Sequence, residues 1–385
     1  MTDKTLRLGR LFGIELRLDY SWFIIFALVT WSLAWHSFPM IHPGLPVGVA
    51  WAMGVVTALL LFASVLAHEL AHSFVAQAQG IPVRDITLFI FGGVAHIGEE
   101  SRSARGELLM ALAGPLASLA IAVLFGLLGF SVPPGSPLST LGRTLAWINA
   151  ALALFNLIPG FPLDGGRVFR AIVWAVTGNP QRATRLAAGL GRVVAIGFIL
   201  WGLWQLFGGS WSDGLWIAFI GWFLYTAATS SMRQAALQDL LRGHTVREVL
   251  MDDCPRVPPT LNLQQLVYGT ALLSGRRCFP VMDDGRLLGV ITMRRIKAVP
   301  RGQWPVTTVG QAMIPVGELR TAGPDEELYE ALTRMAAANA NQLLVVDDDR
   351  WVGMVARDKV LNFIEGCQVA FKKPPQTYAG QEGRR

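Results

Sequence analysis

Six long apolar runs constrain this 385-residue chain more than any other feature of its sequence. A helix needs ~20 residues to cross the ~30 Å hydrocarbon core of a bilayer, and each run approaches or exceeds that length. The runs cover residues 20–38, 49–75, 106–130, 142–159, 189–207 and 211–229. Because 52% of all residues are hydrophobic, one ordinary soluble domain is excluded, and we expect six membrane-spanning helices.

Lys and Arg residues alternate between the two ends of these runs. They occur before the first run, after residue 230 and in segments 76–105 and 160–192. The alternate gaps contain none: 39–48, 131–141 and 208–214. Positive residues collect on the cytoplasmic side, so we expect a multi-pass protein of the plasma (inner) membrane with both termini in the cytoplasm. The net charge of +6 forms no continuous stripe, so no nucleic-acid partner is indicated.

The composition changes near residue 231, where a charged segment begins. The last 155 residues hold 37 Asp, Glu, Lys and Arg residues, against 23 in the first 230. TVREVLM at 245–251 recurs as TVGQAMI at 308–314, and FPVMDDGRLLGVIT at 279–292 recurs as LLVVDDDRWVGMVA at 343–356. An internal repeat of this kind indicates two copies of one α/β unit. We expect the boundaries 1–230 (membrane domain), 231–244 (linker), 245–303 and 304–366 (repeat units) and 367–385 (disordered tail).

Three ionisable side chains stand at the end of the second apolar run, in FASVLAHELAHSFVAQ. Helix positions four apart share a face, so His68 and His72 project together with Glu69 beside them. This H-E-x-x-H spacing is typical of zinc hydrolases: two imidazoles bind the metal, and the carboxylate takes a proton from the water that the zinc activates. Ionisable groups are costly within a membrane, which favours a function. Two histidines that only hydrogen-bond in a polar core are the alternative.

A catalytic zinc ion usually takes a third protein ligand. The candidate is Asp164, in NLIPGFPLDGGR, where Pro159 and Pro162 prevent a regular helix. Non-helical backbone at membrane depth survives only where it is buried in protein or lines a water-filled cavity, and a hydrolase needs such a cavity. A plain turn with a solvated Asp164 is the alternative. The third run carries many small residues, and we assign its Gly114-Pro115 pair to helix packing without chemistry.

The two motifs together resemble the site-2 protease family of intramembrane zinc metalloproteases, which pairs H-E-x-x-H with N-x-x-P-x-x-P-x-D-G. The resemblance covers the membrane part of the chain. It implies that one zinc ion per chain is bound by His68, His72 and Asp164, and that Glu69 is the general base. It also implies that Asn156 holds the scissile carbonyl or its oxyanion. The substrate implied is the transmembrane segment of a single-span protein.

The same resemblance suggests a use for the segment that follows the second run. The stretch Ile86–Phe91 followed by Gly92 and Gly93 is typical of a short strand and turn. Family members place a membrane-associated strand here, which binds an unwound substrate by strand addition. We therefore predict a substrate strand at Phe91, Gly92 and Gly93. Three ionisable residues nearby are taken as solvated: His96, Glu99 and Glu100.

The repeated units resemble a pair of CBS domains, which often bind adenosyl nucleotides. The family's ribose-binding pattern is broken, because Arg295 replaces its acid in the first copy and Lys359 in the second, where Ala356 also replaces the threonine. Basic replacements still favour phosphates. Two interpretations stay open: a nucleotide site near Thr292, Arg295 and Lys359, or a module that is structural or that forms a homodimer.

These observations predict a polytopic α-helical membrane domain of six transmembrane helices with a short membrane-associated β segment, followed by a cytoplasmic α/β tandem CBS domain. The function predicted is intramembrane zinc endopeptidase, regulated by the CBS pair. The first alternative is a CBS-regulated membrane transporter or channel with a cation-binding site. Transporters often repeat their spans in two halves, and H-E-x-x-H has no counterpart in the second half. A catalytically silent sensor is the second alternative.

Overall fold

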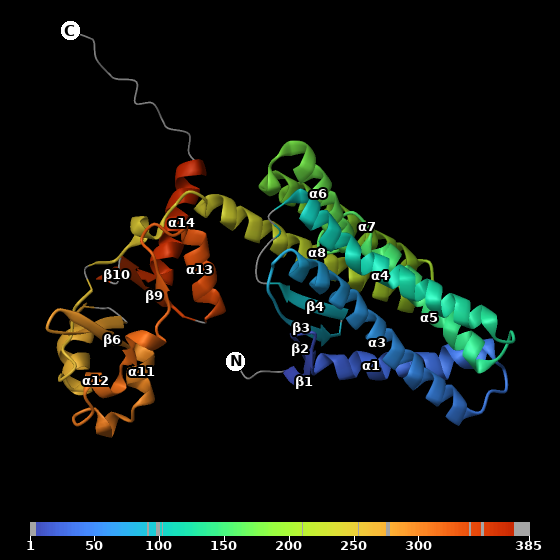
Figure 1. The fold of residues 1–385 in the computed structure, drawn as a ribbon, viewed down its shortest axis with the longest axis horizontal. Coiled ribbons are helices and arrows are strands. Elements are labelled where there is room, and N and C mark those ends of the chain that lie inside the picture. The colour runs from blue at the N-terminus through green and yellow to red at the C-terminus, as the bar shows by residue number, and fades with distance from the viewer. Residues whose placement is uncertain are drawn as a thin grey trace, which may run out of the picture. The chain divides into compact units, whose positions relative to one another are not determined.

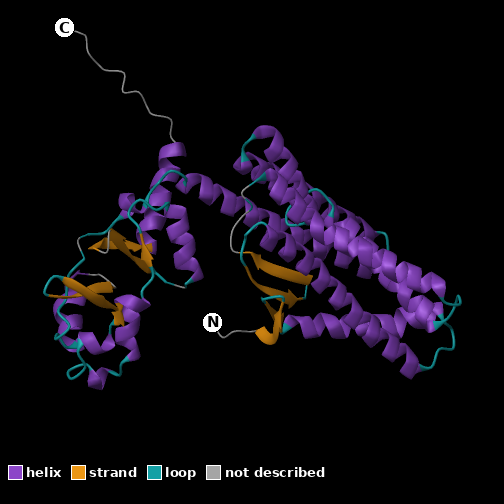
Figure 2. Cartoon of the chain, in the orientation of Figure 1, coloured by secondary structure: helices purple, strands orange, loops and turns teal. Residues whose placement is uncertain are grey.

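The computed structural model describes residues 5–90, 92–97, 101, 103–209, 211–252, 254–274, 278–338, 340–347 and 350–372. The chain forms two compact units, Met1–Ala235 and Ala236–Arg385. The first unit is mostly helical with one small sheet, and the second mixes short helices with two sheets (Figures 1 and 2).

Within the described residues, six helical segments are long and apolar enough to cross a membrane. They are Ser21–Ile41 (α1 Ser21–Ser32, η1 Leu33–Ser37, α2 Phe38–Ile41), α3 (Val47–Ala78), α4 (Ala104–Ser131), α5 (Pro137–Asn156), α7 (Pro180–Phe207) and α8 (Trp211–Leu241). The six predicted spans are confirmed. Two helices extend well beyond their apolar runs. Helix α7 begins at Pro180, because the Asn179 side chain caps it by accepting a hydrogen bond from the backbone N–H of Arg182. Helix α8 continues through the predicted domain boundary at residue 230. Hydropathy marks the membrane part of a helix, whereas capping decides where the helix begins.

A four-stranded sheet packs beside α3. Its order is β1 (Thr5–Leu11), β2 (Ile14–Asp19), β3 (Val83–Phe89), β4 (Gly92–Ile97), and only the β2–β3 pair is parallel. Fully buried Ile14 and Ile86 lie in one hydrophobic cluster with Leu70 of α3. The β1–β2 hairpin was not predicted from sequence, because its alternating Leu and Arg residues lie in a segment that we interpreted only through its positive charge.

The predicted strand and turn near residue 91 need a correction. The strand is β3 and ends at Phe89, and the register Phe89↔Gly92 and Leu88↔Gly93 places both glycines in the next strand, β4, rather than in a turn. Because the chain reverses directly after Phe89, Gly92 and Gly93 pair with the last residues of β3 instead of forming the turn. Phe91, Glu99 and Glu100 lie outside the described residues.

Helix α6 (Asp164–Thr177) is amphipathic and begins directly after the proline-containing loop 157–163. This loop is held against α7: the backbone N–H of Phe161 donates to the Ala187 carbonyl at 3.2 Å, and a Cβ on Gly191 would lie 2.2 Å from the Phe161 carbonyl oxygen. Only glycine permits so close an approach, which fixes the start of α6 relative to α7.

The second unit repeats one arrangement twice. One sheet contains β5 (Cys278–Asp283), β6 (Arg286–Thr292) and β7 (Ile314–Pro315), and the other β8 (Thr321–Ala322), β9 (Gln342–Asp347) and β10 (Arg350–Ala356). The accompanying helical segments are η2 (Val246–Val249), α9 (Leu263–Gln265), η3 (Leu266–Ala271), α10 (Leu272–Ser274), α11 (Met293–Ala298), η4 (Arg301–Gln303), α12 (Val309–Ala312), η5 (Val316–Glu318), α13 (Leu328–Ala337) and α14 (Arg357–Lys372).

The recurring TVRE and TVGQ sequences have a structural cause, because each forms a capping box. Thr245 pairs with Glu248, and Thr308 pairs with Gln311, at the start of a short helix. The predicted disordered tail is wrong for residues 367–372, which continue α14 beyond the buried anchors Val360 and Ile364. Residues 373–385 lie outside the described part of the chain.

Candidate metal centre

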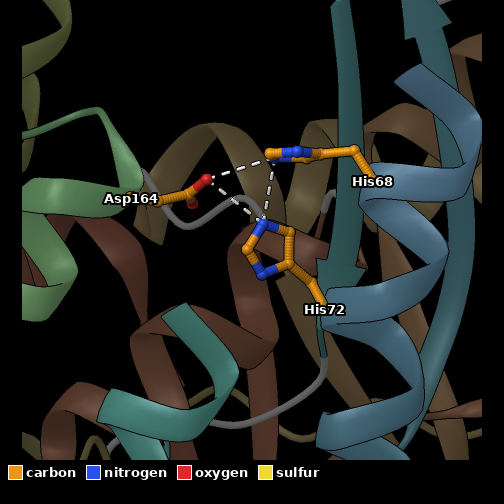
Figure 3. Close-up of side chains that lie close together, drawn as sticks. All are labelled: His68, His72 and Asp164. Carbon is orange, nitrogen blue, oxygen red and sulfur yellow. Dashed lines mark hydrogen bonds and ion pairs between the residues drawn. The ribbon is translucent and has the colours of Figure 1, made fainter. Parts of the chain in front are cut away.

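Three predicted ligands meet at one point of the first unit. His68 and His72 project from one face of α3, and Asp164 is the first residue of α6 (Figure 3). The Nε2 atoms of His68 and His72 lie 3.1 and 3.2 Å from Asp164 Oδ2, and 3.2 Å from each other. Among the described residues, His68, His72 and Asp164 form a group whose ligand atoms all lie within 4.8 Å of one another, which is close enough to hold one metal ion.

The other ring nitrogens of both histidines face α4. His72 Nδ1 lies 2.6 Å from the Met110 carbonyl oxygen, and His68 Nδ1 lies 2.9 Å from Ser118 Oγ, which is fully buried. A carbonyl only accepts hydrogen bonds, so His72 Nδ1 carries the proton and its Nε2 lone pair faces Asp164. This is the tautomer that binds a metal through Nε2, fixed by an outer hydrogen bond.

The donor set and its burial fit zinc. His68 and His72 are 4% and 5% exposed, and the Asp164 side chain is 15% exposed. A carboxylate that is largely removed from water needs a compensating charge, and a divalent cation bound between it and the two imidazoles supplies that charge. Two imidazole nitrogens and one carboxylate oxygen are ligands that zinc prefers, and three protein ligands leave the open position that catalysis needs.

Gly114 of α4 has a role in the site that the sequence did not reveal. A Cβ at this position would lie 2.1 Å from His72 Nε2 and 2.6 Å from His68 Nε2. Close packing of α3 on α4 is therefore confirmed at Gly114, and the missing side chain also leaves room for the two imidazoles. Glycine inside a helix costs ~0.5–1 kcal/mol relative to alanine, and that cost was the available sequence signal for a spatial requirement.

Glu69 lies beside this group, against strand β4. A Cβ on Gly93 would be 2.4 Å from Glu69 Cγ, so the Glu69 side chain packs against the backbone of β4. In the described sheet β4 pairs only with β3, so its other edge is open. The carboxylate predicted to act as a base therefore touches an edge strand.

Asn156 does not join the group. It is the half-buried last residue of α5, and no hydrogen bond or ion pair is found, within the described residues, between it and the three ligands. Another asparagine that the sequence analysis missed, Asn149, is fully buried and donates from Nδ2 toward Ser64 Oγ (3.3 Å) and the Leu145 carbonyl (2.9 Å). A polar amide inside an apolar run was its signal.

The residues predicted for a nucleotide lie in the second unit. The Thr292 hydroxyl caps α11 by accepting from the backbone N–H of Arg295 at 3.3 Å, and the Arg295 and Lys359 side chains are exposed. His96, expected to be solvated, is exposed and lies 3.0 Å from Asp85 through its Nδ1.

Comparison with known proteins gives matches over most of the chain. The model for "Peptidase family M50" matches residues 56–145 and 135–200, and the CBS domain model matches 246–302 and 309–366. A provisionally named zinc metalloprotease of Synechocystis sp. is 36% identical over 94% of this chain and 96% of its own length. A second one, from Mycobacterium tuberculosis, is 35% identical over 98% and 97%. The solved site-2 protease from Methanocaldococcus jannaschii is 29% identical, covers 60% of this chain and 95% of its own, and gives a TM-score of 0.41.

Proposed function

The chain belongs to peptidase family M50 and carries a pair of CBS domains, and on this premise we propose how its residues hydrolyse a peptide bond within the membrane. It is a multi-pass zinc metalloprotease, as the sequence predicted. The observation that carries the proposal is the convergence of His68, His72 and Asp164 from two helices. The family membership favours this function over the transporter, channel or silent sensor.

We propose that His68 Nε2, His72 Nε2 and an Asp164 carboxylate oxygen bind one zinc ion per chain. Zinc held by these three residues would acidify a bound water and polarise the scissile carbonyl. Ser118 and the Met110 carbonyl hold the imidazoles in position from α4. Because the imidazoles are almost fully buried, bulk water is largely excluded from the ligands, which strengthens electrostatic interactions at this point.

Glu69 is the proposed proton acceptor and donor. Its carboxylate takes a proton from the attacking water as the new carbon–oxygen bond forms, and delivers that proton to the leaving nitrogen as the carbon–nitrogen bond breaks. Close packing against Gly93 holds the Glu69 side chain beside β4. Asn156 stays a proposed contact for the carbonyl oxygen, since it ends the helix that leads to Asp164.

The open edge of β4 is the proposed substrate strand, with Gly92 and Gly93 at its start. An extended peptide that adds to this edge passes beside Glu69, because the Gly93 backbone already touches that side chain. A helical segment shields its own peptide bonds, so strand addition also supplies the required unwinding. The proposed substrate is the transmembrane segment of a single-span protein in the same bilayer, cleaved near the cytoplasmic side.

The finer topology and regulation are proposals as well. The distribution of Lys and Arg supports both termini in the cytoplasm of a plasma-membrane protein. For the CBS units, bounded at 245–303 and 304–366, exposed Arg295 and Lys359 support binding of an adenosyl nucleotide through its phosphates. Calorimetry of the full chain with ATP, ADP and AMP tests this: no heat and no melting shift leave the alternative, a structural homodimer module.

A trap variant tests the catalytic proposal. Glu69→Gln keeps the size of the side chain but removes its basicity, so we expect zinc content equal to wild type and no cleavage of casein by the detergent-solubilised full chain. His68→Ala is the control that should lose both zinc and cleavage. Wild-type cleavage by Glu69→Gln would refute the mechanism, and full zinc content in His68→Ala would refute the ligand assignment. Membrane proteins that accumulate uncleaved with Glu69→Gln identify substrates.

A further inference from the structure

A largely buried group of charges joins α4 to α6 beside the proposed metal centre, with the Arg167 side chain 25% exposed. Glu107, in the first turn of α4, is 1% exposed. Arg167 Nε donates to Glu107 Oε1 at 3.0 Å, and Arg170 Nη1 lies 3.6 Å from the same oxygen. Both arginines belong to α6, and Arg170 is itself 7% exposed. In the sequence, these two arginines indicate only the orientation of the chain in the membrane.

The connection of this group to the metal ligands is short at both ends. Asp164 and Arg167 are three residues apart, so they lie on neighbouring positions of one face of α6. On the α4 side, Arg167 Nη2 lies 3.1 Å from Met110 Sδ, and the Met110 carbonyl is the acceptor for His72 Nδ1. Arg167 therefore connects α6, which carries Asp164, to Met110, whose carbonyl orients His72.

We propose that Glu107 is a positioning residue of the zinc site. Its ion pairs with Arg167 and Arg170 fix the first turns of α6 on α4, and thereby fix the Asp164 carboxylate opposite His68 and His72. The loop before α6 fixes the start of this helix relative to α7, whereas the ion pairs with Glu107 fix it relative to α4, the helix that contacts both imidazoles. This inference rests on the proposed assignment of the three zinc ligands.

The geometry suits this role for two physical reasons. Glu and Arg side chains are seldom fully buried unless they are paired, so removal of one charge leaves the others uncompensated and displaces α6. Arginine also approaches the carboxylate with two nitrogens, since Nη2 lies 3.5 Å from Glu107 Oε2, and this fork fixes direction as well as distance. A ligand held through outer residues typically loses ~10–100-fold in metal affinity when they are replaced.

The test measures zinc affinity by chelator competition on the detergent-solubilised full chain. We expect Glu107→Gln and Arg167→Gln each to weaken zinc binding ~10–100-fold, and the double variant to lose less than the product of the two, because the two residues act through one contact. Arg167→Lys keeps the charge but loses the fork, so its affinity should fall between wild type and Arg167→Gln. Zinc should also raise the melting temperature less in the variants than in wild type.

The control is Glu326→Gln in the second unit, where Glu326 pairs with Arg334 at 2.8 Å and is 14% exposed. It should bind zinc as wild type does. Zinc affinity within twofold of wild type in folded Glu107→Gln, or a lower melting temperature with an unchanged zinc-induced shift, would overturn the proposal and leave a structural ion pair. If Glu107→Gln does not fold, Arg167→Lys decides by the same criterion. Zinc retained by His68→Ala would instead mark failure of the ligand assignment.

Discussion

Replacement of Gly114 by alanine should destroy the metal centre without harming helix α4. The new Cβ would lie 2.1 Å from His72 Nε2 and 2.6 Å from His68 Nε2, whereas real Cβ contacts essentially never fall under 3.0 Å. The His72 ring must therefore move by ~0.9 Å or α4 must retreat, and functional constellations tolerate only ~0.5 Å. We expect zinc affinity to fall at least ~100-fold, or ~2.8 kcal/mol at ~1.4 kcal/mol per factor of ten.

The matched control is Gly126→Ala in the same helix. Its Cβ would meet only Ala146 Cβ at 3.7 Å, which is an ordinary contact. Both substitutions favour the helix by ~0.5–1 kcal/mol, so helix propensity cannot explain a difference between them. Zinc content by elemental analysis and affinity by chelator competition on purified full chain provide the measurement. Wild-type zinc affinity in Gly114→Ala would refute the reasoning, because the imidazoles would then not meet at this glycine.

Three further expectations concern the same centre. Ser118→Ala removes the hydroxyl beside His68 Nδ1, so zinc affinity should fall ~10–100-fold in chelator competition; an unchanged value would show that this hydroxyl does not hold the ring. Gly191→Ala places a Cβ 2.2 Å from the Phe161 carbonyl oxygen, so it should displace loop 157–163 and lower casein cleavage ~10-fold or more. The control Gly189→Ala, whose Cβ would have nothing within 4 Å, should cleave casein as wild type does. Equal activities of the two variants would show that the loop does not position the site. Removal of zinc by a chelator should abolish cleavage and added zinc should restore it, and activity that survives full removal would exclude a metal mechanism.

The membrane helices and the repeat could be predicted because their signals are local. A run of ~20 apolar residues forms a helix in a bilayer whatever its neighbours are, because a helix satisfies all its backbone hydrogen bonds within the segment itself. The His68–His72 spacing is local in the same sense, because helical geometry alone brings the two rings to one face. Helix ends were less accurate, as for α7, where capping at Asn179 rather than hydropathy places the start.

The residues around the ligands could not be predicted, because they depend on contacts between distant parts of the chain. The sequence around Gly114 and Ser118 does not show that α4 will lie against the two imidazoles. The sequence around Glu107 likewise does not show that this residue will pair with two arginines that lie 60 or more residues later in the chain. Gly93 shows the same limit, because its place in an edge strand against Glu69 depends on pairing with β3 and packing on α3.

The sequence alone therefore determined the six spans, the repeated second unit and the face of α3 that carries His68 and His72, since these follow from local periodicity and spacing. Asp164 was a candidate ligand because Pro159 and Pro162 interrupt the helix before it, and the resemblance of its motif then implied that it binds the metal. Only the tertiary structure decided which neighbours orient the proposed ligands, where the open strand edge lies and what Arg167 and Arg170 of α6 contact. The physical reason is that each of these depends on the approach of helices and strands far apart in the chain, and that approach is set by the packing of the whole unit.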